Sequence, residues 1–322
     1  MTAHIALPAV NGDSSTPATL APRIITGLLR DSLHFRGVAI TDAMTMEGIG
    51  KGYTAEQSSV LAVQAGAEIL LKPSDATRAI SAVVAAIDRG EISRARIDSA
   101  ARHMLELKAR SGVAFAPTVS LERLREVVGS PAHRAIAAGV ARRAITLLRD
   151  RDSLVPMRGV SRVAVVQYAP ETEIKAGRAF AAELRRSPAL SARGAIIQAG
   201  KILPTATPDA LAAVDRSIGE AETVVVAAFV RRVEGEGRVA MPPQVAAWID
   251  GLAGRRKVIV VAFGNPYIIR QLPAVGSYLV TYGVTDDLER AAARALVGAE
   301  PITGLVPVSL PGFFRAGDGI RR

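Results

Sequence analysis

Short apolar runs that alternate with amphipathic segments are the feature that most constrains how this chain can fold. In the second half of the chain the clearest runs are residues 161–169, 223–231 and 257–264, all rich in valine and alanine. Runs that are apolar at every position are typical of strands buried on both faces of a sheet. Because strands joined through helices form mainly parallel sheets, we expect helices on both faces of this sheet.

The same alternation extends over residues 144–322, for which we expect a three-layer αβα sandwich. The alternation begins at residues 144–150, and its period predicts further strands at residues 194–200, 276–283 and 304–310. Helices are expected between the strands, at residues 208–221, 243–254 and 288–298. The fold class predicted for the chain is therefore α/β.

Residues 1–110 also have the pattern of strand–helix units. The expected strands are residues 1–5, 37–41 and 67–72, and the expected helices are residues 17–33, 55–65, 75–90 and 94–112. Thr54 and Gln57 have the spacing of a capping box at the start of the second helix. The last helix has an apolar stripe that we expect to be buried, formed by Ile97, Ala101, Met104, Leu105 and Lys108. A connector of residues 111–143 separates this region from the second one.

The net charge of +10 raises the question of a nucleic-acid partner. Only six of the 40 basic residues are lysines, the arginines are scattered through alanine-rich helices, and aromatic residues make up 4% of the chain. Nucleic-acid sites concentrate basic side chains on one face and often add aromatic rings that stack on bases. We therefore expect no nucleic-acid partner.

Motifs of metal and cofactor sites are absent from the sequence. The chain has no cysteine, no H-E-x-x-H pair, no phosphate-binding loop and no glycine-rich dinucleotide loop. It also lacks the G-x-S-x-G elbow of α/β-hydrolases. We expect no metal and no cofactor. No apolar run approaches the ~20 residues that span a bilayer, and residues 1–10 do not have the basic start of a secretory signal. Localisation stays open.

Asp42 is the first candidate for a catalytic side chain. It directly follows the apolar strand at residues 37–41. In parallel β/α barrels, residues at the carboxyl ends of strands line the active site. Aspartate is also a common N-cap residue, and residues 43–47 could begin a short helix. The residues alone leave both interpretations open.

His4 ends the expected strand at residues 1–5, at the same level as Asp42. This position makes it a candidate for substrate binding, although a lone histidine is more often structural. His34, His103 and His133 lie among charged residues and are expected at the surface.

Glu234 and Glu236 lie in a glycine-rich loop directly after the strand at residues 223–231. The loop could be solvated, or its carboxylates could face the first region and serve as an acid/base. Asn265 and Pro266 are the nearest approach to a ligand loop, but they have the pattern of an N-cap and a first helical residue.

Several segments taken together resemble glycoside hydrolase family 3. Residues 1–10 and 17–49 resemble the stretch that spans the late barrel strands and the nucleophile of that family. Residues 65–75, 92–108 and 141–157 continue the likeness in order, and residues 264–283 and 292–311 resemble its C-terminal sandwich. The wording TDAMTM at residues 41–46 and AHI at residues 3–5 is closer to the β-N-acetylhexosaminidase branch than to the β-glucosidases.

The resemblance implies that Asp42 is the nucleophile of a retaining glycosidase that removes terminal β-linked N-acetylhexosamine. It implies a TIM-type barrel, of which residues 1–110 match about the last three units. Nothing in the sequence matches the family's His–Asp acid/base loop or its other sugar-binding residues. Glu68 stands where the family usually has aspartate. We therefore expect a C-terminal portion of a family member, inactive alone, whose missing barrel half could be a separate chain.

Two other functions are compatible with the residues. The chain could be a β-glucosidase-type member whose acid/base is Glu234 or Glu236 in the second domain. It could also be a non-catalytic product, such as a carbohydrate-binding subunit or a truncated relic.

Overall fold

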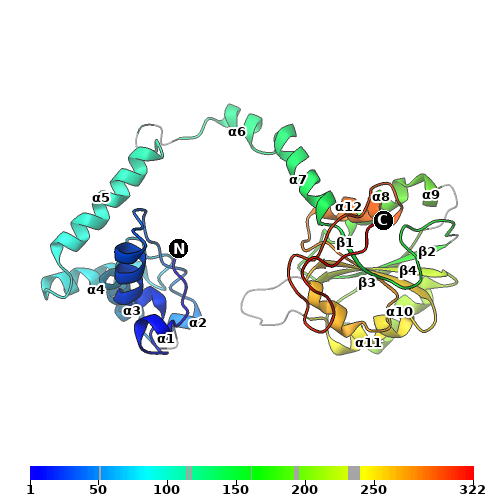
Figure 1. Cartoon of the computed structure of the whole chain (residues 1–322), viewed down its shortest axis with the longest axis horizontal. Helices are drawn as coiled ribbons and strands as arrows, with labels where there is room; N and C mark the ends of the chain where they lie inside the picture. The colour runs from blue at the N-terminus through cyan, green and yellow to red at the C-terminus, as the bar shows by residue number, and fades with distance from the viewer. Residues whose placement is uncertain (51, 114, 116–117, 161, 192–195, 231–239) are drawn as a thin grey trace. The chain divides into compact units, whose positions relative to one another are not determined.

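The chain divides into two compact units, Met1–Leu124 and Arg125–Arg322 (Figure 1). The computed structural model describes residues 1–50, 52–113, 115, 118–160, 162–191, 196–230 and 240–322. The division falls inside the predicted connector, residues 111–143. That the two units are a partial barrel and a sandwich domain stays a prediction at this point.

A mixed sheet of six strands forms the centre of the second unit. Its strands are β1 (Thr146–Asp150), β2 (Val163–Tyr168), β3 (Ile196–Ile202), β4 (Thr223–Val230), β5 (Lys257–Gly264) and β6 (Ser277–Val280). The order across the sheet is β1-β6-β5-β4-β2-β3. All neighbouring strands are parallel except β1 and β6, which are antiparallel. The strands β2 to β6 lie in predicted strand segments, whereas β1 lies where only the start of the alternation was expected; the coarse α/β prediction is confirmed.

Helices cover both faces of this sheet (Figure 1). One face packs against α10 (Pro208–Ile218), α11 (Pro243–Leu252) and the 3₁₀ helix η3 (Pro266–Gln271). The other face packs against α7 (Pro131–Ala144), α8 (Arg178–Arg186) and α12 (Asp286–Leu296). The short helix α9 (Pro188–Ser191) follows α8. Because both faces are covered, every residue of β4 is buried, which explains why its sequence is apolar throughout.

Residues 304–310 do not form the strand expected there. Leu310 forms a bridge with Phe314, and Gly304 donates its backbone N–H to the carbonyl of Ile145, just before β1. The antiparallel neighbour on the open side of β1 is instead Ile320, which bridges to Leu147.

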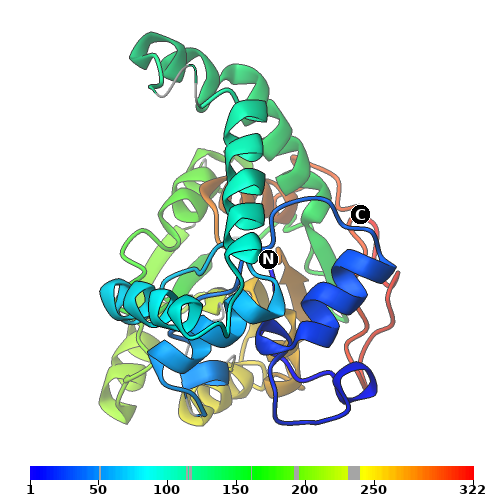
Figure 2. The ribbon, with the colours of Figure 1, turned by 90° about the vertical axis from the view of Figure 1, so that its left-hand side faces the viewer.

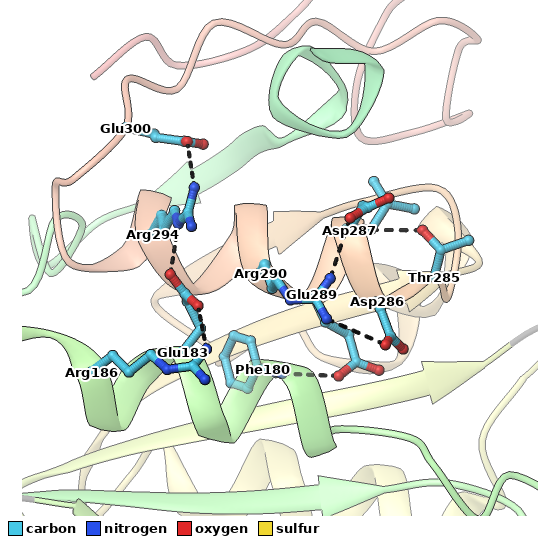
Figure 3. A network of polar contacts seen from close by, with 11 residues as sticks. Phe180, Glu183, Arg186, Thr285, Asp286, Asp287, Glu289, Arg290, Arg294 and Glu300 are labelled. Carbon is cyan, nitrogen blue, oxygen red and sulfur yellow. Dashed lines mark hydrogen bonds and ion pairs between the residues drawn. The ribbon is translucent and has the colours of Figure 1, made fainter. Parts of the chain in front are cut away.

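A buried carboxylate joins α12 to the start of α8 (Figure 3). Glu289 is 2% exposed, and its oxygens accept hydrogen bonds from the backbone N–H groups of Gly177 (3.1 Å) and Phe180 (2.9 Å). These N–H groups have no partner inside the helix, because they precede or begin its first turn. Nearer the surface, Arg294 pairs with Glu183 and Glu300. The packing of α12 on α8 thus has a polar component as well as an apolar one.

The first unit is built mostly from helices (Figure 2). They are α1 (Pro8–Asn11), η1 (Ala18–Leu20), η2 (Arg23–Ser32), α2 (Glu47–Gly50), α3 (Ala55–Ala65), α4 (Ala76–Asp88) and α5 (Arg94–Arg110). The capping box of Thr54 and Gln57 is present at the start of α3, as predicted. The helix expected at residues 17–33 is split, because Pro17 and Pro22 precede a 3₁₀ turn and a π-helix respectively.

Three extended segments of the first unit lie side by side in the order 1–5, 37–41, 67–72. Thr2 donates its backbone N–H to Ile40, and Glu68 and Ile69 donate theirs to Ala39. Ile40 and Ile69 form a parallel bridge. Among the described residues of this unit the pairing is too short to count as a strand. The arrangement is nevertheless that of consecutive parallel segments, with their carboxyl ends at one edge.

The apolar stripe predicted for α5 is not buried, so this prediction is wrong. None of the residues of α5, all of which the structure describes, is buried, and Leu105 is 66% exposed. In Figures 1 and 2, α5 extends away from α3 and α4. The helix α6 (Leu121–Val127) follows and also buries no described residue.

Candidate active site

Asp42 lies where the middle extended segment ends, in a tight turn. Its side chain is half-buried, and its Oδ1 accepts a hydrogen bond of 2.7 Å from the backbone N–H of Ala43. In the described part of the chain no other hydrogen bond or ion pair reaches this carboxylate. The helix α2 begins only at Glu47, so Asp42 is not its N-cap. The carboxylate therefore has one oxygen available for chemistry.

The turn that carries Asp42 is fixed to the third extended segment. The backbone N–H of Thr41 donates to Ile69 (3.0 Å), and that of Met44 donates to Leu71 (2.9 Å). Between them, the hydroxyl oxygen of Thr41 accepts the N–H of Leu71 at 2.9 Å. Thr41 is fully buried. The residues on both sides of Asp42 are thus held by backbone groups of one neighbouring segment.

His4 lies beside this turn, as its position in the sequence predicted. Its Nε2 is 3.0 Å from the carbonyl oxygen of Ala43, and its Nδ1 is 2.9 Å from the hydroxyl of Thr19. The ring is half-buried. Thr19, which is fully buried, lies in η1 and also contacts the hydroxyl of Thr2 and the carbonyl of Ala3. The role of His4 in sugar binding stays a prediction, and both ring nitrogens already have protein partners.

Lys72 is a residue at this edge that the sequence analysis missed. It ends the third extended segment with a φ of +49°, in the left-handed region that costs a residue with a Cβ about 1–2 kcal/mol. It follows Leu71, which bonds to both sides of Asp42. The dipeptide Lys72–Pro73 signals a turn, but a residue before proline normally favours extended backbone. The left-handed conformation was therefore not predictable from the residues.

A buried ionic cluster lies beneath the same three segments. The side chain of Glu68 is 3% exposed and accepts hydrogen bonds from Arg30 (2.7 Å) and from the backbone N–H of Ala39 (2.6 Å). It also pairs with Nδ1 of His103. The expectation that His103 is a simple surface residue is therefore wrong, because α5 carries its ring to Glu68.

Arg96 of α5 reinforces the same region. Its guanidinium donates to the carbonyl oxygens of Val63 (3.1 Å) and Ala67 (2.5 Å). Burial lowers the pKa of Arg96, although the negative charge of Glu68 acts in the opposite direction. Polar contacts thus help to attach α5, which has no fully buried residue, to the first unit.

The candidate acid/base residues Glu234 and Glu236 lie outside the described residues. In the neighbouring loop, Asn265 caps η3 by accepting the N–H of Tyr267 at 2.9 Å, and Pro266 is the first residue of that helix. The structural interpretation of this pair is confirmed.

Tyr282 is a second strained residue, at the carboxyl end of β6. Its φ is +59°, and its buried hydroxyl has no hydrogen-bond partner in the described structure. Burial raises the pKa of this hydroxyl.

Metal and membrane sites find no support in the described residues. They contain no group of three or more histidine, aspartate or glutamate side chains that could hold a metal ion. None of the helices in the described ranges has the length and apolar character needed to cross a membrane.

A cavity of about 630 Å³ opens against α3 and α4, lined in part by Tyr53, Gln57 and Arg89. Neither Asp42 nor His4 lines this cavity.

Comparison with known proteins finds a family model that matches most of the first unit. Residues 1–107 match the family described as glycosyl hydrolase family 3 N terminal domain. A β-N-acetylglucosaminidase/β-glucosidase of Cellulomonas fimi is 25% identical over 324 residues, which are 96% of this chain and 57% of that protein. The β-hexosaminidase A of Pseudoalteromonas piscicida is 29% identical over 181 residues, covering 51% of this chain and 30% of that protein.

A solved structure extends the likeness over both units. The glycoside hydrolase family 3 β-N-acetylglucosaminidase from Paenibacillus sp. str. FPU-7 matches 97% of this chain and 57% of its own, with a TM-score of 0.77 and 28% identity. The chain thus spans about half the length of the relatives that it matches along its whole length. Residues 1–107 thus match the N-terminal domain of glycoside hydrolase family 3, and the whole chain is similar to proteins of that family.

Proposed function

We propose that this chain supplies the nucleophile of a retaining β-glycosidase, and that Asp42 is that nucleophile. The observation that carries the proposal is the position of Asp42 at the carboxyl end of the middle of three parallel segments. Its carboxylate is half-buried and accepts one hydrogen bond from its own turn. A carboxylate held in this way keeps an oxygen free to attack a sugar.

The reaction requires two groups. Asp42 would attack the anomeric carbon and form a covalent glycosyl-enzyme, while a second group protonates the leaving oxygen. The same second group would then remove a proton from the water that releases the sugar. We assign no second group. Glu234 and Glu236 remain candidates, and a residue of a partner chain is the alternative.

For the substrate we propose a terminal β-linked N-acetylhexosamine. The names of the relatives support this choice, since two of the three proteins compared above carry only that activity in their names. The name of the Cellulomonas fimi relative includes β-glucosidase as well, so a terminal β-glucoside is the second candidate. No further residue contact to the sugar is proposed here.

We further propose that Met1–Leu124 is the last part of a TIM-type barrel and that the second unit is the sandwich domain of the family. Three consecutive parallel segments with helices after them support the first assignment, and the covered six-stranded sheet supports the second. The partner that this requires is a chain or segment carrying the other barrel units, which would complete the site around Asp42.

The chain alone is expected to turn over little substrate, because no part of its sequence matches the family's acid/base loop. A non-catalytic role in carbohydrate binding would have the same outcome in an activity assay. A sugar that binds without covalent labelling of the protein, and equally well to Asp42→Asn, would favour the non-catalytic role.

The test is covalent labelling followed by peptide mapping. An activated 2-deoxy-2-fluoro glucoside and the matching activated 5-fluoro N-acetylhexosaminide form slow glycosyl-enzymes that do not depend on acid assistance to the same degree as natural substrates. We expect a mass increase on the peptide that contains Asp42, larger with the N-acetylhexosaminide. Labelling should disappear in Asp42→Asn and persist in Asp31→Asn, a matched change at an exposed aspartate of the same unit. Labelling of a different carboxylate would refute the assignment.

A further inference from the structure

We propose that His4 is a positioning residue that holds the peptide following Asp42 in place, with the other side of its ring anchored on Thr19. This inference rests on the proposed role of Asp42 and goes beyond it by assigning a function to the neighbouring segment. The observation that carries it is the pair of hydrogen bonds that occupies both ring nitrogens of His4.

The carbonyl at Ala43 decides which nitrogen carries the proton. A carbonyl oxygen only accepts, so Nε2 of His4 must donate across the 3.0 Å to Ala43. The hydroxyl oxygen of Thr19 lies 2.9 Å from Nδ1, and the same hydroxyl donates to the carbonyl of Ala3 at 3.1 Å. Thr19 is fully buried. The two contacts of the ring, one on each nitrogen, therefore hold it in one orientation.

The peptide between Ala43 and Met44 is held at both of its polar ends. Its carbonyl accepts from His4, and its N–H donates to the carbonyl of Leu71 at 2.9 Å. The preceding N–H, that of Ala43, donates to the carboxylate of Asp42. If the contact to His4 were lost, the peptide between Ala43 and Met44 could rotate. The adjoining peptide, whose N–H orients the carboxylate of Asp42, would then be less firmly held.

Packing restricts the ring of His4 as well. A Cβ added at Gly48 would lie 2.9 Å from the Cβ of His4 and 3.1 Å from its carbonyl oxygen. Such distances are below normal contact, so α2 approaches His4 this closely only because residue 48 is glycine. The histidine is thus confined by α2 on one side and by η1, through Thr19, on the other.

A direct sugar contact by His4 would need a free ring nitrogen. Both nitrogens are satisfied by groups of the protein, and a ligand could bind one only by displacing Ala43 or Thr19. Positioning the nucleophile requires no such displacement. The geometry therefore favours an indirect role for His4.

The test separates positioning from sugar contact with three variants of the full chain. His4→Phe keeps a ring but removes both nitrogens, His4→Gln keeps a donor that can reach Ala43, and Thr19→Val removes the partner of Nδ1. The first readout is amide hydrogen exchange at Ala43 and Met44, which needs no substrate. We expect exchange about fivefold faster in His4→Phe, since losing one hydrogen bond costs on the order of 1 kcal/mol. His4→Gln should restore most of the protection.

A matched control is His133→Phe, in the exposed first turn of α7, which should leave both amides unchanged. The second readout is the rate of covalent labelling by the fluoro-sugars. Positioning predicts a slower labelling step at saturation with an unchanged half-saturating concentration in His4→Phe. If His4 contacts the sugar directly, His4→Phe should raise the half-saturating concentration and leave amide hydrogen exchange unchanged. That result would overturn the proposal.

A third readout uses the unaltered chain, in case the variants fail to fold. Nitrogen-15 NMR of the imidazole should show a proton on Nε2 of His4, because that nitrogen faces the carbonyl oxygen of Ala43. A proton on Nδ1 alone would overturn the inference. If no sugar labels the chain at all, the proposed function of Asp42 fails, while exchange and NMR still decide the role of His4.

Discussion

Glu68 shows how much a single side chain decides at the residue scale. The carboxylate is buried. It accepts hydrogen bonds from Arg30 and from the backbone N–H of Ala39, and it pairs with the ring of His103. It stands where the family usually has aspartate. Glutamate has one more methylene, and this extra length lets one carboxylate connect the end of η2 with α5. The departure in the sequence therefore has a structural reason that is independent of sugar chemistry.

Removing the charge of Glu68 should destabilise the first unit. Glu68→Gln leaves Arg30 partly buried without its counter-ion, and breaking a buried pair typically costs about 3–5 kcal/mol. Chemical denaturation followed at a probe in the first unit would measure the loss. Glu91→Gln is the control, because its pair with Arg89 lies at the surface and should matter little. Equal stability of the two variants would contradict the role of Glu68.

Asp13 should make the stability of its loop depend on acid pH. Backbone N–H bonds from Thr16 and then Ser15 lower the pKa of Asp13 to about 2. A carboxyl with a lowered folded pKa stabilises the fold above its unfolded pKa, and this contribution is lost as the pH falls through the folded value. The stability difference between the wild type and Asp13→Ala should therefore be constant from pH 7 to 5 and shrink between pH 4 and 2. A difference that does not change over this range would count against the prediction.

At the scale of elements, α12 provides the N-terminal cap of α8 from a distance. Glu289 accepts from Gly177 and Phe180 at the start of that helix (Figure 3). Nothing in the local sequence of residues 177–180 offers a capping side chain, and the cap comes from more than 100 residues later. Replacing it would leave two buried backbone donors without an acceptor.

Glu289→Ala should cost about 2 kcal/mol, because unsatisfied buried donors lose their hydrogen bonds without replacement. Thermal or urea unfolding followed at the single tryptophan, Trp248, in the second unit would measure it. Asp286→Ala, in the exposed first turn of α12, is the matched control and should change stability little. A large effect of the control alone would show that α12 is stabilised through its surface pairs instead.

The same glutamate predicts a pH dependence of opposite sign to that of Asp13. Burial raises the pKa of Glu289, although its bonds to the backbone of Phe180 and Gly177 act against this. A carboxyl with a raised folded pKa contributes most below its unfolded pKa, and the contribution declines as the pH rises through the folded value. The stability difference between the wild type and Glu289→Ala should therefore be larger at pH 4 than at pH 7. A difference that grows with pH would contradict this.

On the scale of the whole molecule, each unit has buried apolar clusters of its own. The second unit has two large clusters, one on each face of its sheet. The first unit has three small ones, around Ile25, Ile49 and Ile92. Because the stability of a unit grows with the apolar surface it buries, we expect the first unit to be the less stable of the two.

Calorimetry should accordingly resolve two unfolding transitions. Ile259→Ala in β5 should lower the free energy of unfolding of the second unit by about 3 kcal/mol and shift only the later transition to lower temperature. Ile25→Ala in η2 should destabilise the first unit by a similar amount and shift only the earlier transition. Both side chains are buried, at 0% and 2% exposure, so the two variants are matched in chemistry and burial. A single transition that both variants shift together would show that the units unfold as one.

Local pattern was enough to place most strands of the second unit, although the strand expected at residues 304–310 does not form. Residues 224–230 are apolar at every position, as is typical of a short strand covered on both faces. The capping box of Thr54 and the cap formed by Asn265 were likewise predictable, since each depends on residues within a few positions. The prediction that the stripe of α5 is buried was wrong, because a helical period of apolar residues does not show whether another element covers them.

For the site, the sequence by itself determined that Asp42 follows an apolar segment and that His4 ends an earlier one. It also determined the likeness to glycoside hydrolase family 3. Only the tertiary structure decided that Nε2 of His4 bonds the carbonyl after Asp42, that Glu68 receives His103, and that Lys72 is left-handed. The physical reason is the separation in sequence. Strand and cap signals act between near neighbours, whereas the contacts of His4 and Glu68 join residues 30 to 40 positions apart. The backbone conformation of Lys72 depends on such distant contacts as well.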